Sequence, residues 1–136
     1  KHTGFEITQG IYQQPIQPTD VCPYIFYAMS INADGQASAC FLDWGRKLLI
    51  GDVRQQSLVD IWRGDSMNAL RLQHLNGQRC KNPVCGDCGQ LTHCLPDNID
   101  ADRQQLLTRF QTMVHVPVGT KVPGLAERRV VPLLAA

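Results

Sequence analysis

The stretch CKNPVCGDCGQLTHC, residues 80–94, decides how the rest of this chain is interpreted. It holds four cysteines, two glycines and one proline, a composition too rich in turn-forming residues for one regular helix or strand. Two more cysteines, Cys22 and Cys40, lie far upstream. Paired thiols on separate segments favour a soft-metal site, because thiolates bind zinc or iron–sulfur clusters in preference to hard cations.

Cys22 and Cys40 bracket a predicted β-hairpin. Residues 24–30 are rich in aromatic and β-favouring side chains, and residues 37–41 supply the returning strand. The Asp34–Gly35 pair between them is a strong turn signal, because both residue types tolerate a positive φ. We therefore expect the hairpin to bring Cys40 back beside Cys22.

Further elements follow the hairpin. A short strand is expected over residues 48–53, broken at Gly51. Ser57 is expected to cap a first helix, a second helix runs from residue 65 or 66 to about 75, and a third runs from Asp100, its cap, to residue 113. Together they predict an α+β fold, with small antiparallel β-hairpins and two to three helices around a cysteine-ligated metal site.

The composition excludes several classes of protein. Of 136 residues, 43% are hydrophobic and 18% are charged, and the net charge is +1, which gives no basis for a nucleic-acid partner. No segment approaches the roughly 20 consecutive apolar residues that span a bilayer, and the first residues lack the apolar stretch of a secretion signal. We expect a cytoplasmic protein with neither nucleic-acid nor membrane partners.

The residues alone leave three uses of the cysteines open. A zinc site is one, because Cys85-x2-Cys88 is the knuckle that puts two thiolates on one tetrahedral ion, with Cys22 and Cys40 completing the set. A plant-type two-iron ferredoxin is another, since Cys80-x4-Cys85-x2-Cys88 reproduces the first three positions of its pattern. That pattern needs a distant fourth cysteine, however, and only Cys94 follows.

The third use is a disulfide framework, which six cysteines would suggest in a small secreted protein. A reducing cytosol argues against it. The chain is also long enough to build a hydrophobic core without covalent cross-links.

The order of the motifs resembles one known family. Cys22-x12-Gly35-x4-Cys40 followed by Cys85-x2-Cys88-x5-Cys94 is similar to the auxiliary iron–sulfur domain, called SPASM or twitch, at the C-terminus of many radical S-adenosylmethionine enzymes. Residues 29–35, 50–53 and 57–62 also resemble the hairpin, the short strand and the Ser-Leu-x-x-Ile-Trp helix of that family. The resemblance covers about residues 20 to 95.

The resemblance also implies how many clusters are bound. Full members carry a further cysteine four residues after the position of Cys94, where this chain has Asn98. The shorter version implies one [4Fe-4S] cluster, with zinc as a substitute when protein is produced in air. Its cofactor-binding residues would be Cys22, Cys40, Cys85 and Cys88. That leaves Cys80 and Cys94 as free thiols, as incidental neighbours or as metal ligands of a partial second site.

The resemblance implies an accessory function. The chain would be the auxiliary [4Fe-4S] cluster-binding domain of a radical SAM oxidoreductase, serving electron transfer or substrate positioning; the alternative is a zinc-stabilised structural or interaction module. Its expected partners are a radical SAM barrel domain, which alone would use S-adenosylmethionine, and a small-molecule or peptide substrate. Because no Cys-x3-Cys-x2-Cys motif is present, we expect a fragment that is not catalytic on its own.

This interpretation divides the chain into four parts. Residues 1–19 would be a linker or a terminal barrel segment, 20–96 the SPASM/twitch-like domain, 97–113 a C-terminal helix and 114–136 an extended tail.

Charged and imidazole side chains near the cysteines leave two further questions. Arg79 and Lys81 flank Cys80 and would tune thiol pKa values or a cluster potential, although such residues usually form only a solvated surface. His74 and His93 are alternative fourth ligands if one cysteine does not reach the metal.

Overall fold

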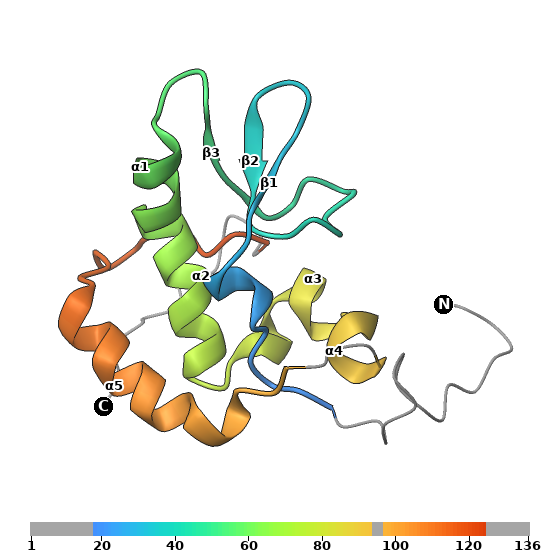
Figure 1. Cartoon of the computed structure of the whole chain (residues 1–136), viewed down its shortest axis with the longest axis vertical. Helices are drawn as coiled ribbons and strands as arrows, with labels where there is room; N and C mark the ends of the chain where they lie inside the picture. The colour runs from blue at the N-terminus through green and yellow to red at the C-terminus, as the bar shows by residue number, and fades with distance from the viewer. Residues whose placement is uncertain (1–17, 94–96, 125–136) are drawn as a thin grey trace, which may run out of the picture.

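The computed structural model describes residues 18–93 and 97–124, and it confirms the predicted α+β class (Figure 1). One antiparallel sheet has the strand order β1-β2-β3, and short helices follow it along the chain. The strands are β1 (Ser30–Ile31), β2 (Gln36–Ser38) and β3 (Leu49–Asp52). The alternating residues 5–8, Phe-Glu-Ile-Thr, have the pattern of a short strand, but they lie outside the described residues.

Helices make up most of the remaining structure. The 3₁₀ turns are η1 (Tyr24–Phe26), η2 (Arg79–Lys81) and η3 (Asp100–Asp102). The α-helices are α1 (Leu58–Arg63), α2 (Asp65–Leu75), α3 (Pro83–Gly86), α4 (Gly89–His93) and α5 (Arg103–Met113). The segment whose composition predicted no regular element contains η2, α3 and α4. Each of them is only about one turn long, and such short turns can form in a sequence rich in turn-forming residues.

The hairpin turn forms where the sequence predicted it. Gly35 has φ +86°, and its N–H donates to the carbonyl of Asn32. The first strand is much shorter than predicted, however, since Tyr24–Phe26 forms η1 instead. The N–H groups of Tyr27 and Ala28 donate to the carbonyl of Tyr24 at 3.1 and 2.8 Å, which closes a helical turn where a strand was expected.

Strand β3 runs through Gly51 rather than breaking there. Gly51 pairs with Ala37 in the sheet, and a Cβ atom at this position would lie 2.7 Å from Cγ1 of Ile61. Helix α1 therefore packs directly onto the backbone of the strand, which requires a residue without a side chain.

Helix α2 is the centre of the molecule. Ser57 caps the preceding α1 as predicted, since its Oγ accepts from the N–H of Asp60 at 3.1 Å. Every residue of α2 from Met67 to Leu75 is buried, and Figure 1 shows α5 and η1 beside it. Gly77, with a positive φ of +69°, follows the C-cap Asn76, a position where glycine commonly ends a helix.

Residues 114–124 contain neither helix nor strand, but they belong to the packed structure. Val116 and Val122 are 6% and 3% exposed and join the core around α2. In the part of the chain that the structure describes, no helix combines the length and apolar character needed to cross a membrane.

Candidate metal centre

Four of the cysteines converge from both halves of the chain. Cys22 precedes η1, Cys40 follows β2, and Cys85 and Cys88 lie in and after α3. Cys85 interacts electrostatically with the thiols of the other three, and Cys22 with those of Cys40 and Cys88. These four are the residues that the sequence had singled out as a set.

Their surroundings are largely dry. Cys85 is buried, and Cys22, Cys40 and Cys88 are half-buried. Burial raises the pKa of Cys22 to about 11 and that of Cys85 to about 12, with the neighbouring thiols adding to both; burial also raises the pKa of Cys40. Without metal these three thiols are protonated at neutral pH, so ligation must displace their protons.

Backbone donors face two of these sulfurs. The N–H of Leu42 donates to Sγ of Cys40 at 3.4 Å, and the N–H groups of Tyr24 and Ile25 donate to Cys22. N–H···S bonds of this kind favour the thiolate and tune the potential of a bound cluster.

An aromatic contact joins the two upstream cysteine segments. The ring of Tyr24 meets the ring of Phe41 edge to face, with 5.3 Å between centroids. Each ring lies close in sequence to a cysteine, two residues after Cys22 and directly after Cys40. The pair holds the end of the hairpin against η1 by a contact that also shields apolar area.

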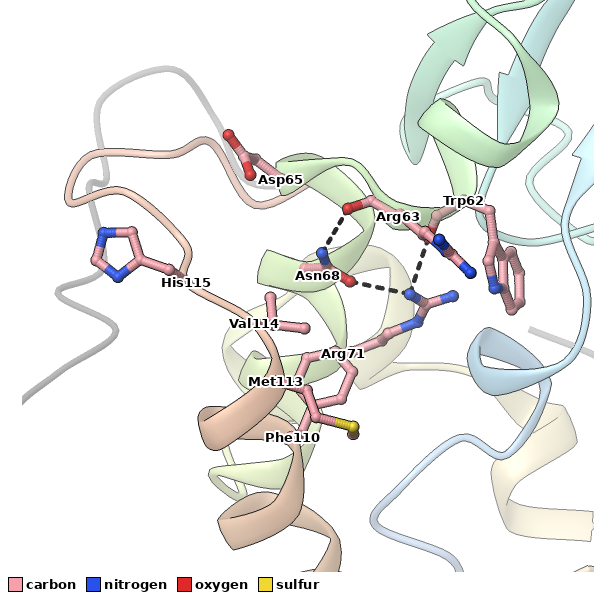
Figure 2. A pocket seen from close by; sticks show the side chains of 9 residues that line it. All are labelled: Trp62, Arg63, Asp65, Asn68, Arg71, Phe110, Met113, Val114 and His115. Atoms are coloured by element: carbon pink, nitrogen blue, oxygen red, sulfur yellow. Dashed lines mark hydrogen bonds between the residues drawn. The ribbon is translucent and has the colours of Figure 1, made fainter.

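Arg71 fastens η1 to the helices. Its Nε donates to the carbonyl of Ile25 at 2.9 Å, and its Nη1 donates to the carbonyl of Trp62 and to Oδ1 of Asn68, both at 2.9 Å. Figure 2 shows this side chain at the wall of a hollow of about 520 Å³ between α2 and the end of α5. The guanidinium lies 4.2 Å from the ring centroid of Trp62, which is partly buried against the core.

Asn82 caps the helix that carries Cys85. Its Oδ1 accepts from the N–H groups of Val84 and Cys85 at 3.0 and 3.3 Å, while its Nδ2 donates to the carbonyl of Pro123 at 2.7 Å. Sequence reasoning missed this residue. The signal was present, because an asparagine followed by proline is a typical helix start.

The segment before Cys22 is held by Asp100. Its carboxylate accepts from the N–H groups of Asp20 and Val21, both at 2.8 Å. The prediction that Asp100 caps a helix is wrong, because it opens the turn η3 and α5 begins only after Asp102. The carboxylate serves a distant segment instead of its own helix.

His74 positions the backbone of Cys22, and its Nδ1 accepts a hydrogen bond. The N–H of Cys22 donates to this atom at 3.2 Å, and the side chain is fully buried. Burial, with a further contribution from the positive charge of Arg79, lowers its pKa to about 4. A neutral imidazole accepting at Nδ1 carries its proton on Nε2.

The other predicted site residues are placed differently. Cys80 is exposed on η2. Cys94 and the side chain of His93 lie outside the described part of the structure. The five described cysteines form no disulfide with one another, so the disulfide alternative has no support among them. Among the same described residues, no three His, Cys, Asp or Glu side chains approach closely enough to hold a single metal ion.

Known proteins similar to this chain include a domain family and a dehydrogenase. Residues 22–89, half of the chain, match the model of the iron-sulfur cluster-binding domain SPASM. The chain is also similar to the S-adenosyl-L-methionine-dependent 2-deoxy-scyllo-inosamine dehydrogenase of Niallia circulans, with 29% identity over 58 residues. That match covers 43% of this chain and 23% of the relative. No solved structure matches.

Proposed function

Because this chain belongs to the SPASM family of iron-sulfur cluster-binding domains, we propose that it holds one [4Fe-4S] cluster on Cys22, Cys40, Cys85 and Cys88. The mutual interaction of the four thiols carries this proposal. Thiols from two segments more than forty positions apart that meet in one half-buried place are typical of residues that share a metal or cluster.

The donor set fits a [4Fe-4S] cluster. Four thiolates are the usual ligands of a cubane cluster, and each binds a different iron. Its sulfurs therefore stand farther apart than those around one tetrahedral zinc, whose Zn–S bonds are about 2.3 Å long. Four cysteine thiols that interact with one another supply the number and type of ligand that such a cluster takes.

The residues around the thiols have defined tasks at this site. Asn82 fixes the start of the turn between Cys85 and Cys88. His74 fixes the backbone at Cys22, and Arg71 fixes the backbone of η1 at Ile25. The half-buried sulfurs limit access of water, which protects a cluster from hydrolysis and sets its potential. A bound cluster would supply transfer of single electrons.

We place this cluster in a larger enzyme. The relative with a dehydrogenase name uses S-adenosylmethionine, and the chain spans about a quarter of its length. The chain would thus be the auxiliary domain of a radical SAM oxidoreductase, next to a barrel domain that binds S-adenosylmethionine, and would serve electron transfer or substrate positioning. The substrate class we propose is a small molecule or a peptide, with neither nucleic acid nor membrane as a partner, in the cytoplasm.

Metal analysis of anaerobically produced protein tests the proposal. The 136-residue chain should contain about four iron and four acid-labile sulfide per chain, with the absorbance of a cubane cluster. Zinc alone under the same conditions would instead support a structural or interaction module and would contradict the cluster.

A further inference from the structure

Arg79 is a basic residue whose side chain contacts the backbone of the Cys85–Cys88 turn. It lies on η2, yet its Nη1 donates to the carbonyl of Cys85 at 2.6 Å and to the carbonyl of Gly86 at 3.2 Å. The turn η2 packs closely on α3, since a Cβ atom on Gly86 would lie 3.1 Å from the carbonyl oxygen of Cys80. One guanidinium thus ties the backbone around Cys85 to the preceding turn.

The positive charge of Arg79 has no carboxylate partner in the described structure. The ion pairs within residues 18–93 and 97–124 use Arg46, Arg54 and Arg103. The Nε of Arg79 is buried and has no hydrogen-bond partner there. A partly buried, uncompensated cation acts strongly on its neighbours, because little water or counter-charge screens it.

The thiol of Cys85 and the imidazole of His74 both respond to this charge. Burial is the main cause of the raised pKa of Cys85, and the charge of Arg79 works against that rise. The same charge adds to the effect of burial in lowering the pKa of His74. Arg79 therefore acts electrostatically on a proposed ligand and on the residue that holds Cys22.

Lys81 offers a matched comparison. It carries the same charge on the same turn, two residues away, but its side chain is exposed to water. Water and salt screen an exposed ammonium far more than a half-buried guanidinium. Position, and not charge alone, separates the two residues.

We propose that Arg79 is a positioning residue for the Cys85–Cys88 turn and that its unpaired charge raises the reduction potential of the cluster. This inference rests on the proposed function. A [4Fe-4S]²⁺ cluster with four thiolates carries a net charge of −2, and accepting one electron makes it −3. A nearby cation stabilises the more negative state, so its removal must lower the potential.

Anaerobic redox titration of the reconstituted 136-residue chain tests this inference. Dithionite supplies one electron per cluster and is oxidised to sulfite, and electron paramagnetic resonance records the reduced form. We expect Arg79→Gln to lower the reduced-to-oxidised ratio about tenfold at a given potential, a fall of about 59 mV for a one-electron couple. Lys81→Gln should leave the ratio within about twofold of the original protein.

A conservative variant separates charge from fold. Arg79→Lys keeps the cation but loses the planar fork, so we expect a near-original potential together with weaker iron retention on dilution. The electron paramagnetic resonance signal comes only from molecules that hold a cluster. If Arg79→Gln loses most of its iron, Arg79→Met provides a second neutral variant. Equal potentials for Arg79→Gln, Arg79→Met and Lys81→Gln would overturn the inference.

The outcomes distinguish the two proposals. An original chain that binds neither iron nor sulfide contradicts the proposed function. An original chain with a full cluster whose potential ignores Arg79 contradicts only the inference about this residue.

Discussion

The backbone N–H of Cys22 donates a hydrogen bond of 3.2 Å to Nδ1 of His74, which joins residues 52 positions apart. The imidazole belongs to the central helix α2 and is fully buried. The first cysteine of the site is therefore anchored through its backbone to the core of the protein, while its sulfur stays available for a ligand.

Removing this anchor should destabilise the protein. His74→Ala leaves the N–H of Cys22 without its acceptor and opens a cavity in the core, which should lower the free energy of unfolding by about 2–4 kcal/mol. Urea unfolding monitored by circular dichroism measures the change. The matched control, His115→Ala, alters an exposed imidazole and should change stability by less than about 0.5 kcal/mol. Equal unfolding midpoints for the two variants would show that the contact is unimportant.

Alanine substitution of the cysteines should separate ligands from bystanders. Cys22, Cys40, Cys85 and Cys88 each supply one sulfur to the proposed cluster, so each single alanine variant should lose most of its iron. Cys80→Ala should retain it, because that thiol is exposed on η2. We also expect a mild effect for Cys94→Ala. Iron content of the six variants is the measurement, and loss at Cys80 or Cys94 as severe as at the other four contradicts the ligand assignment.

Removal of the metal should loosen one region. The turn η2 and the helices α3 and α4 are each only a few residues long, so they depend on ligation more than α2 does. In amide hydrogen exchange, residues 79–93 should exchange much faster after chelation, whereas residues 67–75 should stay protected because they are buried throughout. Unchanged exchange over residues 79–93 would mean that the fold of this region is independent of metal.

Asn82 should be intolerant of even a close substitute. Asn82→Ala removes the cap on α3 and should cost about 2 kcal/mol. Asn82→Asp keeps an excellent capping acceptor, but it replaces the donor to the carbonyl of Pro123 and buries a charge, since Asn82 is fully buried. We therefore expect the aspartate variant to be at least as unstable as the alanine variant in urea unfolding. A stable aspartate variant would assign Asn82 to capping alone.

Alanine substitutions at Gly51 and Gly89 test how closely the backbone is packed at each glycine. An alanine Cβ at Gly51 would lie 2.7 Å from Cγ1 of Ile61 and 2.8 Å from Oε1 of Gln56, so Gly51→Ala should force α1 away from β3 and cost about 1–3 kcal/mol. At Gly89 a Cβ meets nothing within 4 Å, and Gly89→Ala should be neutral within about 0.5 kcal/mol. Thermal melting of both variants checks this, and similar melting temperatures would contradict the close packing at Gly51.

Several local features were predictable from neighbouring residues alone. The Asp34–Gly35 turn, the Ser57 cap and the second helix, ending by residue 75, appear as predicted, because each depends on propensities or contacts within a few positions. The iron–sulfur family was also recognisable, since its signature lies in the spacing of cysteines and short motifs along the chain.

Where local signals met distant partners, the predictions were incomplete. Tyr24–Phe26 has the composition of a strand, but it forms a 3₁₀ turn in which the carbonyl of Ile25 accepts from Arg71, 46 positions away. Asp100 has the position of a cap, but its carboxylate serves residues 20 and 21, about 80 positions away. Propensity is a weak preference, and a few tertiary hydrogen bonds are sufficient to override it.

The sequence by itself determined that the thiols fall into two neighbouring pairs. The spacing of Cys85 and Cys88 fixes one tight turn, and the hairpin returns Cys40 toward Cys22. Only the tertiary structure decided that the thiols of the two pairs interact and that Arg79 and His74 bind the backbone of Cys85 and Cys22. The physical reason is that these relationships span tens of residues. They arise from the packing of separate segments around α2, and no local pattern encodes how such segments are placed relative to one another.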